Sequence, residues 1–224
     1  MILSYNMNDT KLILRTIIFT LLLSACTQKQ ASFPIQEGIP YFHSPDFTPI
    51  WISAKAQLDT LHILSDFNFK NQKGETISSK NFKGRIHVAN FFFTICPSLC
   101  PKIMGNMMTI QKEFKNDENV LIASYSVMPE RDSVSVLRRY ATTHHILDNK
   151  WHLLTGDKKQ IYDIARHSYF ADENLGVQKG ENDFLHTENF ILVDKNLHIR
   201  GIYNGTLTLE IEQLVKDIRA LEQE

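Results

Sequence analysis

No excess of positive or negative charge marks this sequence: its formal net charge is −1, and the charges are interspersed along the chain. A basic surface for nucleic acid is therefore excluded. Long apolar runs are also scarce, because the apolar stretch near the N-terminus, Thr16–Leu23, is too short to span a membrane. Cysteine is scarce too, with three residues in 224. The 14 Phe and seven Tyr residues can fill a sizeable core, and the length allows one or at most two domains.

The N-terminus has the features of a secretory signal. Lys11 and Arg15 precede the apolar stretch, and small residues follow it. The stretch ends in "LSAC", which resembles a bacterial lipobox, so we expect Cys26 to be the first mature residue and to carry lipid. An ordinary signal peptide with a chance cysteine is the alternative. Translation starting at Met7 would leave the signal intact.

Three regions follow from this interpretation. Residues 1–25 are the lipoprotein signal peptide, residues 26–60 a tether and extended arm, and residues 61–224 the globular domain. Four prolines in the arm disfavour regular secondary structure there, and its aromatic residues are expected to pack on the domain. These residues are Tyr41, Phe42, Phe47 and Trp51. The predicted location is the cell envelope, with the lipid in a membrane and the domain facing the periplasm.

The domain alternates predicted strands and helices, which favours an α/β fold of thioredoxin-like type. Its central sheet should be mixed, with helices on both faces and an N-terminal hairpin. The predicted elements are a hairpin over 62–78, strands over 85–94, 120–127 and 151–156, helices over 101–115, from about Asp132 to 144 and over 157–168, a hairpin over 188–205 and a helix over 208–223.

Cys96 and Cys100 lie where the first buried strand gives way to a helix. Such a pair is a structural disulfide, a redox couple or a clamp for a soft metal. A disulfide closing so small a loop should contribute less than the ~3 kcal/mol expected of a 15-residue loop, so stability is a weak reason for the pair. The free N–H groups and the dipole of a helix N-terminus lower the pKa of nearby thiols, which favours nucleophiles or metal ligands.

The spacing and a downstream histidine favour the metal. Thioredoxin-type reductants normally place two residues between their cysteines, whereas three separate Cys96 from Cys100. In thioredoxin-like proteins a Pro-Thr pair just before the corresponding strand faces the two cysteines. Here His186-Thr187 stands in that place. An imidazole beside two thiolates supplies a third donor.

Four segments together resemble the Sco (SenC-type) family of copper-binding thioredoxin-fold proteins, over roughly residues 61–222. The segment ending in "TICPSLCP" matches the family's T-x-C-P-x-x-C-P motif. The other three are "PERDSVSVLRRYA", "LLTGDKKQIYDIAR" and "LHTENFILVDKNLHIRGIY".

The resemblance implies that Cys96, Cys100 and His186 bind Cu(I) or Cu(II). It implies a metallochaperone whose client is the copper-site subunit of cytochrome oxidase or another copper protein. Two family acidic residues near the site are replaced, by Met128 and by Leu185 after Phe184. Their loss favours Cu(I) as the resting state, since the soft donors remain.

Two other functions compete with copper delivery. One is a thiol-disulfide reductase that keeps the client's copper ligands reduced, with Cys96 attacking and Cys100 resolving. The other is a peroxiredoxin-like peroxidase, which Thr94 allows but which the absence of an arginine in the motif loop disfavours. The chain is therefore an enzyme only if its two cysteines carry out redox chemistry and do not serve solely to bind copper.

Other soft or imidazole side chains have simpler interpretations. Met104, Met107 and Met108 have the spacing of helix core residues, and His144-His145 sits at a predicted helix end that favours cations. Met128 is expected at the carboxyl end of the second buried strand, where it could approach a metal. The remaining histidines are interpreted as solvated or packing residues.

Overall fold

The computed structural model describes residues 38–52, 58, 60–95, 100–171 and 187–224. From Asn68 onward, strands and helices follow the predicted order. The elements are β1 (Tyr41–Phe42), β2 (Pro49–Ile50), β3 (Asn68–Lys70), β4 (Thr76–Ser78), the 3₁₀ turn η3 (Ser79–Asn81), β5 (Ile86–Phe92), α2 (Cys100–Glu113), β6 (Val120–Ser126), α3 (Val134–Thr143), β7 (Trp151–Leu154), α4 (Lys158–Asp163), the π-helical turn η4 (Ile164–Ser168), β8 (Asn189–Val193), β9 (Ile199–Asn204) and α5 (Thr208–Glu222).

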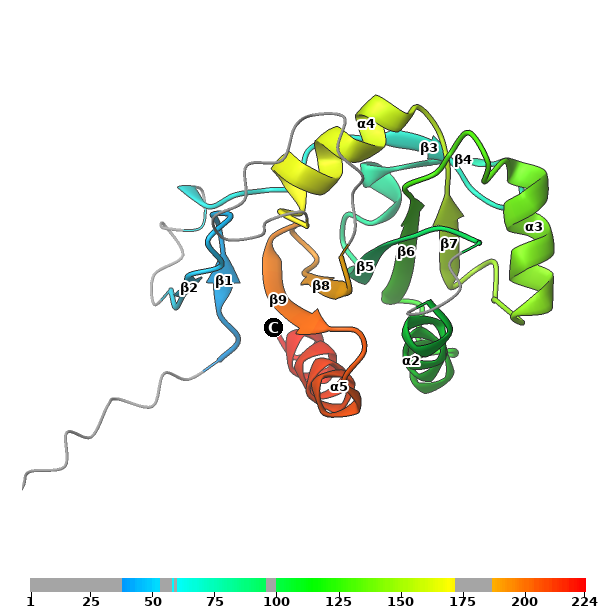
Figure 1. The fold of residues 1–224 in the computed structure, drawn as a ribbon. Helices are drawn as coiled ribbons and strands as arrows, with labels where there is room; N and C mark the ends of the chain where they lie inside the picture. Colours follow the sequence, from blue (N-terminus) through cyan, green and yellow to red (C-terminus); the bar gives the residue numbers. More distant parts are fainter. Residues whose placement is uncertain (1–37, 53–57, 59, 96–99, 172–186) are drawn as a thin grey trace, which may run out of the picture. The chain divides into compact units, whose positions relative to one another are not determined.

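A seven-stranded mixed sheet forms the centre, in the order β2-β1-β9-β8-β5-β6-β7, and β3 and β4 pair as a separate hairpin (Figure 1). Strands β5, β6 and β7 are parallel, whereas β8 runs antiparallel to β5 and β9 antiparallel to β8. All seven residues of β5 and all seven of β6 are buried, as their continuous apolar runs predict for strands covered on both faces. The predicted thioredoxin-like α/β fold is confirmed.

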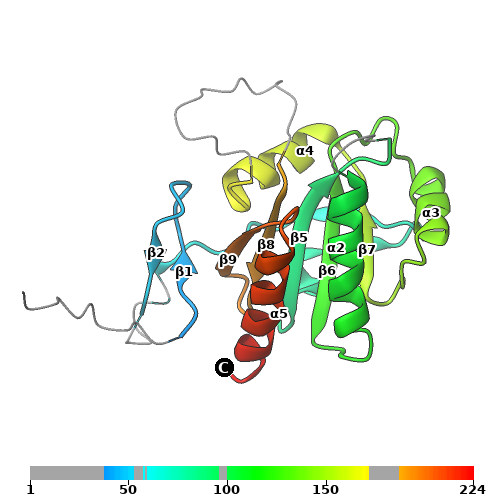
Figure 2. The same ribbon diagram turned by 60° about the horizontal axis from the view of Figure 1, so that its bottom comes forward.

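Two apolar clusters cover the two faces of the sheet. Along β5, Ile86 and Val88 belong to one cluster, and Ala89 and Phe91 to the other, which is the alternation of a strand. Side chains of α2, α3 and α5 fill the first cluster. Residues of α4, η4 and the β3–β4 hairpin fill the second. Figures 1 and 2 show α2 and α5 side by side on one face, with α4 on the other.

The segment before the β3–β4 hairpin contributes strands of its own. β1 pairs antiparallel with β9, joining Phe42 to Ile199, and β2 pairs with β1. Phe42 and Phe47 pack against the apolar cluster that α4 covers, while Trp51 donates a hydrogen bond to the Gly38 carbonyl (3.2 Å). The short strands were not expected from the sequence, because this pairing is with a strand about 160 residues away.

Arg200 on β9 holds this N-terminal segment and the C-terminus together. Its side chain is 3% exposed. The guanidinium donates to the carbonyls of Ile39 (2.8 Å) and Pro40 (3.1 Å), and its central carbon lies 3.9 Å from the centre of the Tyr41 ring. It also donates to both carboxylate oxygens of Glu224 (2.6 and 2.9 Å) and to Asp194 (3.2 Å). Such a bidentate, buried arrangement suits arginine and not lysine.

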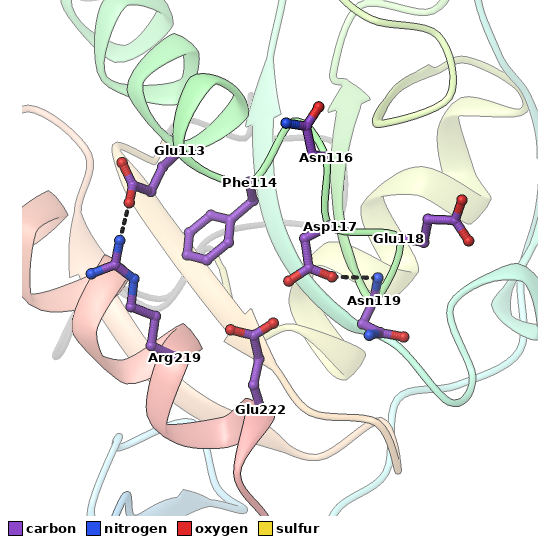
Figure 3. Close-up of a pocket in the computed structure, with 8 residues that line it drawn as sticks. All are labelled: Glu113, Phe114, Asn116, Asp117, Glu118, Asn119, Arg219 and Glu222. Atoms are coloured by element: carbon purple, nitrogen blue, oxygen red, sulfur yellow. Dashed lines mark hydrogen bonds and ion pairs between the residues drawn. The ribbon is translucent and has the colours of Figure 1, made fainter.

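A pair of carboxyl groups faces each other where α2 leads into β6 (Figure 3). Asp117 comes from this turn and Glu222 from the last turn of α5. A hydrogen bond between the two side chains, together with partial burial, raises the pKa of Glu222 to about 7. The same hydrogen bond lowers the pKa of Asp117. The pair therefore shares one proton at moderately acidic pH.

Replacing Glu222 with glutamine should flatten the dependence of stability on pH between pH 5 and 7. The folded-state pKa of Glu222 lies above its ordinary value of 4.5, so folding retains a proton in this window and stability falls as pH rises through it. Solvent screening limits the effect to about 1 kcal/mol. Thermal unfolding from pH 5 to 8 measures it, with Glu118→Gln as the control on the same turn. Equal pH slopes for wild type and Glu222→Gln would exclude the shared proton.

Candidate functional site

The cysteine motif follows the carboxyl end of β5. Phe92 ends the strand, Thr94 and the half-exposed Ile95 form the turn after it, and α2 begins at Cys100. The prediction that the second cysteine opens a helix is confirmed. Cys96 and residues 97–99 lie outside the described residues. The helix N-terminus at Cys100 provides free backbone N–H groups at this edge of the sheet.

The segment before β8 reaches the same edge. The antiparallel register of β5 with β8 pairs His87 with Val193 and Ala89 with Ile191, so the start of β8 lies beside the end of β5. Thr187 is the first described residue of this segment and its Oγ1 accepts a hydrogen bond from the Asn189 N–H (3.1 Å). His186 directly precedes it and lies outside the described residues. The described residues that flank the predicted metal ligands therefore converge on one edge of the sheet.

Gly205 ties α2 to the start of β8. Its N–H donates to the Glu188 carbonyl (2.8 Å), and its own carbonyl accepts from the Asn106 side chain on α2 (2.7 Å). A Cβ on residue 205 would lie 2.7 Å from the Glu188 carbonyl oxygen and 2.5 Å from a ring carbon of Phe190. Only glycine fits this approach of two backbones. This contact fixes α2, which begins at Cys100, relative to the segment that follows His186.

A buried carboxylate anchors the turn that leads to Cys96. Asp132 is 1% exposed. Its Oδ1 accepts from the Thr94 hydroxyl (2.5 Å), and its Oδ2 accepts from the Thr94 N–H (3.2 Å) and the Ser126 hydroxyl (2.6 Å). The sequence predicts a helix starting near Asp132, and α3 begins two residues later, at Val134, while the Asp132 side chain turns inward to this site. Sequence reasoning missed this role.

Met128 lies at this edge, as predicted. It follows the end of β6 by two residues, and its side chain is partly buried against the apolar cluster that α4 covers. Its N–H donates to the Ser126 hydroxyl (3.2 Å). The Tyr162 hydroxyl of α4 donates to the neighbouring Val127 carbonyl (3.2 Å), which ties α4 to the same edge. Phe184 and Leu185, the other predicted departures from the acidic pattern, lie outside the described residues.

Several of the remaining soft and imidazole side chains lie in packing positions. Met104 and Met107 are buried in the core, which confirms their interpretation as packing residues. His144 packs on the Tyr140 ring, with the ring centres 4.3 Å apart. Burial lowers the pKa of His87 to about 3, so it is a neutral core residue. Among the described side chains, no group of three or more His, Cys, Asp and Glu residues is arranged to hold a metal ion.

The expected lipid attachment concerns residues near the N-terminus. Cys26 and its signal lie outside the described residues. Across the part of the chain that the structure describes, no helix has both the length and the apolar character needed to cross a membrane.

Comparisons with known proteins identify a family. Residues 55–223 match the SCO1/SenC family. A SCO1/SenC family lipoprotein from Bacillus anthracis str. Ames is 30% identical with a TM-score of 0.62, over 72% of this chain and 95% of its own. BsSco, described as having a disulfide switch and as a member of the Sco family of cytochrome c oxidase assembly proteins, is 29% identical with a TM-score of 0.61, over 72% and 94%. Arabidopsis thaliana ScoI, solved with copper bound, is 26% identical with a TM-score of 0.55, over 70% and 98%.

Proposed function

Because the chain belongs to the SCO1/SenC family, we propose that it binds one copper ion through Cys96, Cys100 and His186 and delivers the ion to a cytochrome oxidase copper site. One observation carries the proposal. The turn before Cys96, the helix that begins at Cys100 and the strand that begins just after His186 all meet at one edge of the sheet. Three donors separated by up to 90 residues in sequence would thereby come within reach of one ion.

The donor set suits copper. Two thiolates and a neutral imidazole are soft to intermediate ligands, which favour Cu(I) and tolerate Cu(II). The N-terminus of α2 at Cys100 favours the thiolate form that binds metal, because its dipole and free N–H groups stabilise negative charge. Ile95, half exposed beside Cys96, places the start of the loop at the surface, where a client protein could reach it. Copper could then pass to the client by exchange of ligands, with no change of protein fold.

The oxidation state follows from the residues around the donors. Carboxylates near the site would favour the more highly charged Cu(II). Met128 stands at the carboxyl end of β6 where the family commonly has Asp, and Leu185 replaces the other acidic residue. We expect Cu(I) as the resting form.

The dithiol supports a second function, a thiol-disulfide reductase for the client's copper-ligand cysteines. The start of α2 at Cys100 favours it, since helix N-termini activate thiols. The Cys96 thiolate would attack a client disulfide, forming a mixed disulfide and releasing one client thiolate. Cys100 would then displace the second client thiolate, leaving a reduced client and a Cys96–Cys100 disulfide. Copper binding requires His186, whereas this exchange does not.

Replacing His186 with alanine should separate the two functions. The variant should fold and keep its dithiol, lose Cu(II) binding and bind Cu(I) about tenfold or more weakly. Wild-type binding should also weaken as pH falls through the range of the imidazole, because a protonated ring has no lone pair to donate. The measurements are the Cu(II) spin-resonance spectrum and competition with a chromophoric Cu(I) chelator. His145→Ala, near the end of α3, is the matched control. If His186→Ala matched wild type in both measurements, the reductase would become the better assignment.

The proposed location is the cell envelope, with the mature chain tethered to a membrane through lipid on Cys26 and the domain facing the periplasm. Support comes from the "LSAC" sequence and from similarity to a lipoprotein of Bacillus anthracis str. Ames. Intact-mass measurement of the membrane-extracted protein tests it. An unmodified Cys26, or a mature N-terminus elsewhere, would rule out the anchor.

A further inference from the structure

We propose that Asp132 is a positioning residue that holds the cysteine loop in the geometry needed for metal capture and for disulfide formation, an inference that rests in part on the proposed function. It acts through Thr94, two residues before Cys96. Neither residue is a proposed ligand. Their contact lies within the described residues, at the base of the loop.

The hydrogen bonds fix Thr94 in two ways at once. Its backbone N–H and its hydroxyl donate to different oxygens of the same carboxylate (3.2 and 2.5 Å). Two bonds from one residue set both the backbone direction and the side-chain rotamer. The chain therefore leaves β5 in a defined direction. On the other side of the cysteine motif, α2 begins at Cys100.

Asp132 is itself rigidly held. Its N–H donates to the Met128 carbonyl (2.9 Å), which closes the turn after β6. The Ser126 hydroxyl donates to its Oδ2 (2.6 Å). The anchor thus belongs to the end of β6, the strand that pairs with β5 along its full length. Thr94 is therefore attached, through Asp132, to the central strands of the sheet.

Asp132 is a buried acidic residue, which a turn does not need. Burying a carboxylate is costly unless its oxygens are fully hydrogen-bonded. In the described part of the chain no Lys, Arg or His side chain forms an ion pair with Asp132; the three N–H and O–H groups compensate for its burial. Hydrogen bonds to a charged acceptor are about twice as strong as neutral ones. Two of the three hydrogen bonds to Asp132 come from Thr94, two residues before Cys96.

A pair of nearly isosteric substitutions tests the proposal. Thr94→Val removes the hydroxyl and keeps the shape, whereas Thr94→Ser keeps the hydroxyl. Ser124→Ala is the control. Ser124 lies on β6, two residues before Ser126, and its buried hydroxyl contacts Asn90 and Trp151 and not Asp132. Asp132→Asn is the second variant at the anchor itself. Three quantities are measured: thermal stability, Cu(I) affinity against a chromophoric chelator, and the equilibrium of the Cys96–Cys100 disulfide in glutathione buffers.

We expect Thr94→Val to weaken Cu(I) binding about tenfold, the effect of losing one hydrogen bond to a charged group. A looser loop also brings the thiols together less often, so the disulfide should become about tenfold easier to reduce, a change of about 30 mV toward positive potential. Asp132→Asn should change both in the same direction. Thr94→Ser and Ser124→Ala should match wild type in both, although Ser124→Ala should lower the thermal stability.

If Thr94→Val kept the wild-type copper affinity and disulfide equilibrium while losing stability like Ser124→Ala, Asp132 would be a structural residue only, and the proposal would be wrong. If Asp132→Asn failed to fold, the two Thr94 variants would still show whether the contact between Thr94 and Asp132 affects copper affinity and the disulfide equilibrium. If reduced wild type bound no copper, the proposed function would fail, and the disulfide equilibrium alone would decide whether Asp132 positions the loop.

Discussion

Replacing either Cys96 or Cys100 with serine should lower the affinity for Cu(I) by more than about 100-fold, since even outer-shell partners of metal ligands are worth 10–100-fold. A serine hydroxyl remains protonated and is a hard, weak ligand for a soft cation. Both variants should keep their fold, because two apolar clusters of described strand and helix residues already fill both faces of the sheet.

Competition with a chromophoric Cu(I) chelator measures the loss. Met108→Leu is the matched control, since it removes a sulfur from the same helix at a partly buried position in the core. It should bind copper as wild type does. Wild-type affinity in a Cys96→Ser or Cys100→Ser chain would show that copper binds elsewhere.

The second large effect concerns the fold. Arg200→Met should lower the free energy of unfolding by about 3–5 kcal/mol, the usual result of breaking a buried ion pair by removing one partner. Methionine fills most of the volume, but it removes the only charged partner of the buried Asp194 among the described residues and the side-chain donor to the carbonyls of Ile39 and Pro40. The segment 38–52 should detach before the rest of the sheet unfolds, because its remaining attachments are one residue pair between β1 and β9 and the packing of partly buried side chains such as Phe42 and Phe47.

Urea unfolding gives the stability, and limited proteolysis followed by mass analysis locates the released segment. Arg219→Met provides the control. Arg219 also pairs with a glutamate, Glu113, but its side chain is 60% exposed, so its loss should cost less than about 1 kcal/mol. Equal destabilisation by the two substitutions would mean that Arg200 does not hold the segment.

Local sequence patterns predicted the central elements well. The apolar runs of β5 and β6 indicate strands buried on both faces, and the structure buries every residue of both. Pro101 is tolerated in a first helical turn, and α2 does begin at Cys100. Alternation around Asn71–Gly74 correctly predicted the β3–β4 hairpin. These signals are local, so a single sequence contains them.

The features that were missed depend on contacts between distant residues. "PERDSV" has the composition of a helix start, and nothing local shows that the Asp132 side chain turns toward Thr94, 38 residues earlier. The pairing of β1 with β9 is equally non-local. The candidate site was predicted from motif spacing and family resemblance. The structure supports the convergence of its segments, while the ligand roles of Cys96, Cys100 and His186 remain predictions.

These roles share one physical requirement. Two free thiolates and a neutral imidazole must face one ion, and a disulfide between Cys96 and Cys100 removes two of the three donors. Redox state should therefore control copper loading. The loop geometry that Asp132 is proposed to hold would serve both states, because two cysteines near enough to share an ion are also near enough for their side chains to rotate into a disulfide.

The most direct test is copper titration of the domain, from residue 38 onward, in its fully reduced and its fully oxidised form. Metal analysis after removal of unbound copper gives the stoichiometry. The proposal predicts one Cu(I) per reduced chain and none per chain carrying the Cys96–Cys100 disulfide. Equal copper uptake by the two forms would contradict a site built on both thiolates.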